Sequence, residues 1–230
     1  VMYFGNLQGI LEYDGVHWRF IKTSHETTVR SLAIDESGRI YAGAVGEIGY
    51  LAPDSLGTLN YQSLLKLIPE KDLDFGHVWN TYATNHGIYF QSRNKIFRWD
   101  GKNMKVWHGE EPSSFHVMFY VNNNIYVRQR EIGLVQMTDE SLKLVKGGKQ
   151  FAEVGVFTML PLNSEKILLS TLNKEYYIMS TKKTAGQIQS VKISPFYSQM
   201  DHFLNETIVY NGSVLNKNSF SLVLQVQGCL

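Results

Sequence analysis

Tyr3-Phe4-Gly5-Asn6-Leu7-Gln8-Gly9-Ile10-Leu11-Glu12-Tyr13-Asp14-Gly15 is one of two stretches of this chain that share a pattern, and the other is Tyr89-Phe90-Gln91-Ser92-Arg93-Asn94-Lys95-Ile96-Phe97-Arg98-Trp99-Asp100-Gly101. Each reads as an apolar pair, a polar turn, a second apolar pair, an aromatic residue and then Asp-Gly. The second stretch begins about 86 residues after the first, which is roughly twice the length of a four-stranded propeller blade. A third copy is therefore expected between them.

Arg39-Ile40-Tyr41-Ala42-Gly43 is that third copy, because it has the same aliphatic and aromatic opening. Three more openings follow along the chain, at Ile125-Tyr126-Val127, Ile167-Leu168-Leu169 and Phe220-Ser221-Leu222. The mean interval from Met2 to Phe220 is roughly 44 residues. A repeat of this length predicts an all-β fold, a β-propeller of four-stranded antiparallel blades with about five blades present.

One repeat shows all four strands of a blade. Short apolar runs bounded by Gly, Asn, Asp or Ser predict strands at 29–35, 39–44, 48–52 and 59–65. The nearest candidate for a helix, 64–71, is cut short by Pro69. Second strands of successive blades are expected near Tyr41, Tyr89, Tyr126 and Leu168.

The whole chain, residues 1–230, is expected to form a single propeller domain that is part of a ring. Its repeats are placed at approximately 1–22, 29–65, 77–108, 114–146, 154–194 and 206–230. Because Val1-Met2-Tyr3 already reads as the middle of a strand, further residues are expected upstream in the intact protein.

Composition narrows the class of protein. The chain is 43% hydrophobic, 13% aromatic and 19% charged, so it can bury a core and carries no signature of disorder. Its net charge of +1 gives no long-range field for nucleic acid, and no direct nucleic-acid contact is expected. The apolar runs are too short for a transmembrane helix. A single cysteine, Cys229, excludes an internal disulfide and a multi-cysteine zinc site.

The repeats resemble a known family, the two-component regulator propeller repeats. The residues that carry the resemblance are 29–43, Gly46-Glu47-Ile48-Gly49-Tyr50-Leu51, Asp74-Phe75-Gly76-His77-Val78-Trp79, Ile88-Tyr89-Phe90-Gln91-Ser92 with Lys95-Ile96-Phe97, and Ser194-Pro195-Phe196 with Phe203-Leu204. Leu169-Ser170-Thr171-Leu172 departs from the family's glycine-rich blade turn. Family members are typically seven-bladed, so the resemblance implies that the chain is part of a seven-bladed ring.

The resemblance also implies a function. It suggests the periplasmic, extracytoplasmic sensor domain of a membrane-spanning bacterial regulator, either a transcriptional regulator or a hybrid histidine kinase. The domain would bind a small molecule or an oligosaccharide and signal to a kinase or DNA-binding output domain outside this chain. Such propellers are not enzymes. Two alternatives stay open: a polysaccharide-active enzyme on a propeller scaffold, and a protein-interaction propeller with an exposed apolar patch.

Motifs for catalysis or for metal and cofactor binding are weak in this sequence. Gly43-Ala44-Val45-Gly46-Glu47-Ile48-Gly49 lacks the Lys-Ser/Thr of a phosphate loop and reads as a hairpin turn. The seven histidines show no short metal-ligand spacing, and Asp72 and Asp74 read as solvated turn residues rather than a glycosidase pair. We therefore predict no catalytic residue, no metal and no cofactor.

Blade topology predicts where a ligand binds. The loop that enters the first strand of a blade and the loop between its second and third strands emerge on the same face of a propeller, where ligands usually bind. Residues expected there are Arg30, His77, Trp79, Arg93, His116, Arg128 and Arg130. Guanidinium, imidazole and indole groups suit hydroxyl-rich or anionic ligands. Trp18, Trp99 and Trp107 are expected to pack between blades, whereas Trp79 is open between packing and ligand contact.

The two ends of the chain raise the question of ring closure. The stretches 2–4, 10–13 and 18–21 supply a second, third and fourth strand, and 207–215 could supply the first. A strand at 220–226 would then have no place, so we expect an arc of about five blades. Its open edges would be covered by other polypeptide, including a second copy of the chain in a homo-oligomer, or would be disordered.

Overall fold

The computed structural model describes residues 1–109, 113–138, 141–184, 187–197, 207–216 and 219–226. The chain divides into two compact units, Val1–Phe115 and His116–Leu230, and each is described by itself. Cys229 and Phe203-Leu204 lie outside the described residues. Within the described ranges, no helix is long and apolar enough to cross a membrane.

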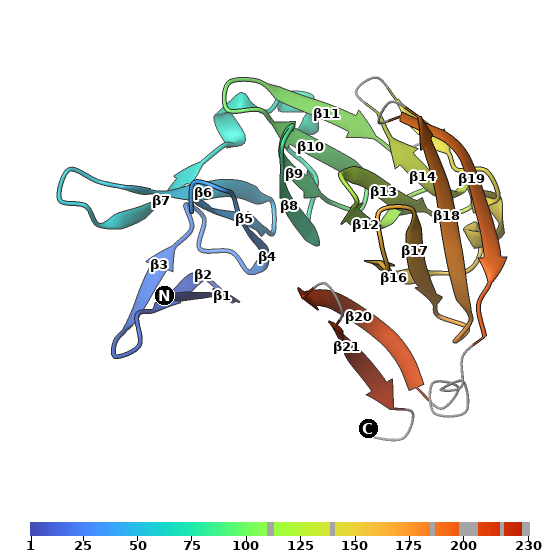
Figure 1. Ribbon diagram of the computed structural model, residues 1–230. Coiled ribbons are helices and arrows are strands. Elements are labelled where there is room, and N and C mark those ends of the chain that lie inside the picture. Colours follow the sequence, from blue (N-terminus) through green and yellow to red (C-terminus); the bar gives the residue numbers. More distant parts are fainter. Residues whose placement is uncertain (110–112, 139–140, 185–186, 198–206, 217–218, 227–230) are drawn as a thin grey trace. The chain divides into compact units, whose positions relative to one another are not determined.

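The first unit contains three antiparallel sheets that follow one another in chain order (Figure 1). The first sheet has three strands, β1 (Met2–Asn6), β2 (Gly9–Tyr13) and β3 (Trp18–Lys22). The second has four, β4 (Val29–Ile34), β5 (Ile40–Ala44), β6 (Glu47–Pro53) and β7 (Leu59–Ser63). The third also has four, β8 (Asn80–Thr84), β9 (Gly87–Gln91), β10 (Lys95–Trp99) and β11 (Met104–His108). Two short 3-10 helices, η1 (Leu65–Leu67) and η2 (Glu70–Asp72), replace the helix candidate around Pro69.

The second unit continues the pattern. Its first sheet, the fourth in the chain, contains β12 (Phe115–Val121), β13 (Asn124–Gln129), β14 (Gly133–Met137) and β15 (Leu142–Leu144). The 3-10 helix η3 (Gly148–Phe151) leads to a fifth sheet of β16 (Val156–Pro161), β17 (Lys166–Thr171), β18 (Tyr176–Thr184) and β19 (Gln187–Pro195). A sixth sheet pairs β20 (Thr207–Asn216) with β21 (Ser219–Val226).

These sheets confirm the predicted fold class. The fold is all-β, its four complete sheets are four-stranded antiparallel blades, and their second strands are β5, β9, β13 and β17, as the repeat predicts. Neighbouring sheets pack through their first strands, since β4 lies against β8 and β16 lies against β20. This is the contact that strands around a propeller axis make. Closure of a ring, its blade number and the domain organisation stay predictions.

The repeated aspartates form one kind of turn. Asp14, Asp54 and Asp100 each stand between the last two strands of a sheet, and each carboxylate accepts two backbone N–H groups from residues two to four positions later in the chain. These backbone bonds hold the pKa of all three carboxyl groups below its usual value. The Asp-Gly repeat of the sequence is thus a turn signal.

Apolar side chains fill the space between consecutive sheets. Ile10 and Ile21 of the first sheet form one core cluster with Val29, Ala42 and Leu51 of the second. A second cluster joins the second and third sheets, and a third lies within the second unit. As predicted, Trp99 and Trp107 are buried.

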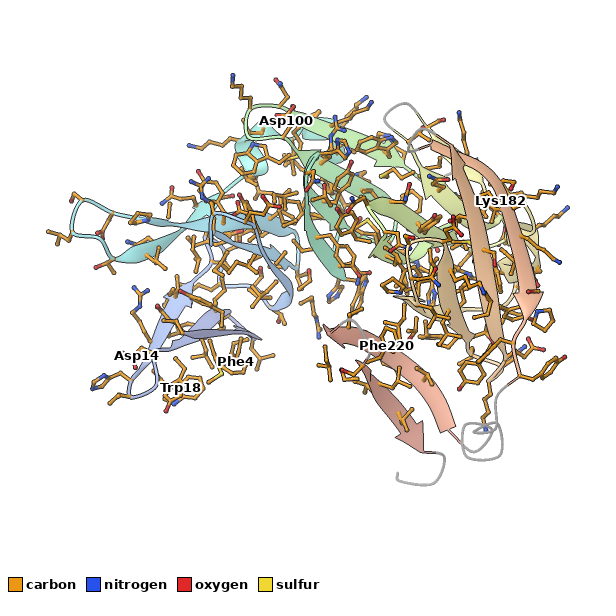
Figure 2. All side chains as sticks on the ribbon, viewed as in Figure 1. Phe4, Asp14, Trp18, Asp100, Lys182 and Phe220 are labelled. Carbon is orange, nitrogen blue, oxygen red and sulfur yellow. The ribbon has the colours of Figure 1, made fainter. Side chains whose placement is uncertain are left out.

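The first sheet exposes an apolar face. Met2, Tyr13 and Trp18 are cross-strand neighbours, as are Phe4, Leu11 and Phe20. Phe4 and Trp18 lie side by side on this sheet, with ring centroids 5.7 Å apart (Figure 2). Trp18 is 59% exposed, so the prediction that it packs between blades is wrong. Trp18 lies on the side of the first sheet that, in the later repeats, packs against the preceding sheet. The first sheet has no preceding sheet in this unit, so Trp18 is exposed.

Candidate functional site

The predicted binding end of the first unit is built by hydrogen bonds between loops. The turn between β5 and β6 bonds to the loop entering β4, through Val45 N–H to Thr28 O at 3.0 Å. It also bonds to the loop entering β8, through Gly46 N–H to Gly76 O at 2.6 Å. Val45 and His77 form an isolated antiparallel bridge at the same place. The two kinds of loop therefore lie at one end of the first strands, as the topology predicts.

A β-bulge marks the beginning of the first strand in several sheets. The register shifts by one residue between Val29 and Ser31, between Val156 and Thr158, and between Val209 and Asn211. The extra residues are Arg30, Phe157 and Tyr210. Each follows a buried valine, and a bulge turns the extra side chain away from the alternation of the strand.

The third and fourth sheets place corresponding residues at this position. Trp79 N–H donates to Gln91 O at 2.8 Å, although the register partner of Gln91 is Asn80, so two residues oppose one. His116 follows buried Phe115 at the start of β12, as the other residues follow buried valines. The register shifts at Arg30, Phe157 and Tyr210, and Trp79 and His116 hold the corresponding positions; we call all five the bulge residues.

Three of the predicted residues meet in the first unit. The guanidinium of Arg30 lies 5.5 Å from the centroid of the Trp79 ring. The imidazole of His77 stacks on the same indole, with centroids 5.0 Å apart and planes 20° apart. Arg30 is exposed and Trp79 is 48% exposed. We call Arg30, His77 and Trp79 the Arg30–Trp79 cluster.

The other predicted arginines, Arg93, Arg128 and Arg130, lie at or near the ends of second strands and make different contacts. Arg93 is exposed on the turn between β9 and β10, and its carbonyl accepts Phe115 N–H at 2.8 Å. Arg128 is buried, and its Nε and Nη2 donate to the carbonyls of Phe151 and Ala152 at 3.0 and 2.5 Å. Burial and the neighbouring Arg130 lower the pKa of Arg128. Arg130 itself is exposed. Two of the five N–H donors of the Arg128 guanidinium thus bind backbone carbonyls.

Aromatic side chains surround His116 in the second unit. Its ring meets Phe157 edge to face, with centroids 5.2 Å apart and planes 86° apart. Phe157 in turn lies 5.4 Å from Tyr210. Phe157 and Tyr210 were not predicted as site residues. A signal was present in the sequence, since Val156-Phe157-Thr158 and Val209-Tyr210-Asn211 match Val29-Arg30-Ser31 and Val78-Trp79-Asn80.

The titration of His116 gives a testable pH dependence. Burial and, secondarily, Arg128 and Arg130 lower the pKa of His116 from 6.5 to about 4. Between these values the unfolded chain binds a proton that the folded unit does not bind. The stability that this histidine contributes is therefore fully present above pH 6.5 and is lost as the pH falls toward 4.

Between pH 6.5 and 4, the free energy of unfolding of the second unit is expected to fall more in the unmodified protein than in a His116→Gln variant. Urea denaturation at pH 7.5, 6 and 4.5, followed by far-UV circular dichroism, measures the difference between the two proteins. A constant difference across the three pH values would contradict the lowered pKa. Carboxylates titrate equally in both proteins and cancel in the comparison.

The described residues show no cluster of three His, Cys, Asp or Glu side chains able to hold a metal ion. One cavity of about 460 Å³ lies between the hairpin of β2 and β3 and the hairpin of β6 and β7, and none of the bulge residues lines it. Glu12 and Arg19 line it and form an ion pair with each other. Arg19 Nη1 also donates to Leu59 O at 3.1 Å, so these side chains join the first two sheets.

Comparisons with solved structures agree with the fold. The chain is similar to the extracellular domain of the putative one-component system BT4673 from B. thetaiotaomicron, with a TM-score of 0.60 and 14% identity over 96% of this chain and 29% of that chain. For the extracellular domain of the putative hybrid two-component system BT4673, from the same organism, the TM-score is 0.52 and the identity is 16% over 82% of this chain and 25% of that chain. The chain is also similar to the β-propeller domain of Myceliophteria thermophila Cps50 (Swd1), with a TM-score of 0.54 and 9% identity over 84% of this chain and 67% of that chain.

These likenesses show a propeller fold, and the bacterial structures among them are of the kind that the sequence resemblance names. The chain spans less than a third of the length of either bacterial structure. No model of a known protein family matches the chain. No curated protein matches it either.

Proposed function

We propose that this chain is a ligand-sensing propeller of an extracytoplasmic signalling protein, and that it binds its ligand at the Arg30–Trp79 cluster. The observation that carries the proposal is the geometry of this cluster. A bulge in each of two consecutive sheets brings an exposed guanidinium over a half-exposed indole, with an imidazole stacked beside them. Large aromatic surfaces and arginine forks left at the surface are typical of binding sites.

Two further observations support a sensor. The sequence resembles the propeller repeats of two-component regulators, and the fold is similar to extracellular domains of proteins described as one-component and hybrid two-component systems. Ligand binding at the cluster would be signalled to a kinase or DNA-binding domain outside this chain. Because the bulge follows a buried valine in each sheet, a ligand that moves Arg30 or Trp79 acts directly on the contact between first strands.

A variant that removes the indole tests this proposal. The screen uses thermal denaturation with a panel of plant and host oligosaccharides. A ligand at 100 times its dissociation constant is expected to stabilise the protein by about 2.7 kcal/mol. The Trp79→Ala variant should lose this stabilisation, because the cluster loses the ring that holds Arg30 and His77.

Trp18→Ala is the matched control, since it also removes one exposed indole from the first unit but lies on the apolar face of the first sheet. It should bind the ligand as the unmodified protein does. If Trp79→Ala keeps the full stabilisation, or if no member of the panel stabilises the unmodified protein, the proposed site is wrong.

A further inference from the structure

The Arg30 guanidinium has no acidic partner. In the described part of the chain, its only recorded contact is with the Trp79 ring, and no carboxylate forms an ion pair with it. A guanidinium carries five N–H donors, and stacking on an indole leaves these donors free in the plane of the group. Arg30 is therefore held in place but not neutralised.

Two carboxylates near this end of the first unit are already occupied. Glu47 is fully buried, and its two oxygens accept Ser24 N–H at 3.0 Å and His25 N–H at 3.2 Å. Glu26 pairs with Lys22 at 2.9 Å. Arg93 adds a second exposed guanidinium on the turn between β9 and β10, again without a carboxylate partner among the described residues. The three residues of the cluster thus include no carboxylate, and the exposed Asp74 of the loop entering β8 forms no ion pair with Arg30.

This imbalance separates two kinds of ligand. A neutral sugar presents hydroxyl groups, which both donate and accept, so a guanidinium that only donates leaves the donor capacity of those hydroxyl groups unused. A carboxylate or sulfate ester only accepts, and a planar guanidinium binds it through two parallel charge-assisted bonds. The exposed part of Trp79 offers apolar surface to the ring that carries the anion.

We propose that the Arg30–Trp79 cluster selects acidic saccharides over neutral ones. The oxyanion accepts hydrogen bonds from Arg30, and the sugar ring lies against the exposed surface of Trp79. This inference rests on the proposed function and names the substrate class of the same site. It predicts a preference that depends on a single guanidinium and that weakens with added salt.

The test compares matched ligands on the whole 230-residue chain by isothermal titration calorimetry. The pairs are trigalacturonate with its methyl ester, and a sulfated chondroitin disaccharide with its desulfated form. At least one acidic member should bind about tenfold to a hundredfold more tightly than its neutral partner at low salt, the range expected for hydrogen bonds to a charged group. In an Arg30→Gln variant, that ratio should fall to about one.

Arg39→Gln is the matched control. Arg39 is also exposed and lies 5.1 Å from the centroid of the Tyr50 ring in the same unit, so it has the same kind of cation–π contact at a different place. This variant should keep the preference for the acidic ligand. A preference lost equally in both variants would mean that general charge, and not the cluster, attracts the anion.

Other outcomes separate the two proposals. If neutral and acidic members bind equally and Trp79→Ala abolishes both, the selectivity is wrong and the proposed sensor site stands. If only inorganic sulfate binds, the cluster is an anion site, and both the saccharide inference and the proposed oligosaccharide ligand fail. If none of the saccharides binds, both proposals are overturned.

Discussion

Replacing Gly43 by alanine is expected to lower the free energy of unfolding of the first unit by about 3 kcal/mol, the upper part of the range for overpacking a filled core. Gly43 lies on β5, opposite the bulge at Arg30. A Cβ atom there would overlap Val78 Cγ1 and would come within 2.7 Å of Ser31 Oγ and 2.8 Å of Thr81 Oγ1. These atoms belong to two packed sheets, so none can move alone. Because Val78 precedes Trp79, the substitution should also disturb the Arg30–Trp79 cluster.

Tryptophan fluorescence measures this prediction selectively, since all four tryptophans, Trp18, Trp79, Trp99 and Trp107, belong to the first unit. Guanidinium denaturation should show an earlier midpoint for Gly43→Ala. Gly57→Ala is the control: its Cβ would meet nothing within 4 Å, and only its φ of +82° opposes the change. It should cost about 1 kcal/mol, the usual cost of a left-handed alanine. Equal midpoints for the two variants would contradict the steric explanation.

Replacing Arg128 by methionine is expected to destabilise the second unit by about 3 kcal/mol, because two hydrogen bonds from a charged group to buried carbonyls are lost together. Methionine fills similar space along the aliphatic stem, so the loss isolates the polar contacts. The carbonyls of Phe151 and Ala152, at the end of η3 and just after it, would be left without this donor.

Far-UV circular dichroism follows the strands of both units. The part of its change that tryptophan fluorescence does not show belongs to the second unit, which contains no tryptophan. The fluorescence transition of the first unit should not change in Arg128→Met. Arg130→Met is the matched control because Arg130 is exposed on the next turn, and its stability should stay within about 0.5 kcal/mol of the unmodified protein. If both variants are equally stable, Arg128 does not hold η3 in place.

The repeat in the sequence predicts the fold well for a physical reason. A blade needs the same alternation, the same turns and the same aliphatic–aromatic second strand each time, so three or four copies reinforce one another. Ile40-Tyr41-Ala42-Gly43 and Ile88-Tyr89-Phe90-Gln91 therefore predict β5 and β9 closely. The exposure of Trp18 could not be predicted in this way, because it depends on which sheet covers the first one rather than on the local pattern.

The candidate site was only partly predictable. Loop topology predicted that Arg30, His77 and Trp79 lie at one end of their blades, and the structure brings these three side chains into contact. Phe157 and Tyr210 were missed because a bulge adds one residue to a strand, and a strict alternation of period two then assigns the wrong face. The partners of Arg128 lie 23 and 24 residues away, so no local pattern reveals them. Whether these groups form one ligand site stays a prediction.

The position of the bulge residues at the start of the first strands also has an evolutionary consequence. Comparing the repeats within this one chain, the residue before the bulge is Val29, Val78, Phe115, Val156 and Val209, always buried and apolar. The bulge residue itself is Arg, Trp, His, Phe or Tyr. Packing is thus assigned to the first position, and the proposed ligand contacts to the second, where Arg30, Trp79 and Tyr210 are exposed. On the proposed function, substitutions at Arg30 or Trp79 would change ligand recognition without replacing a core residue, so the site could diverge faster than the scaffold that carries it.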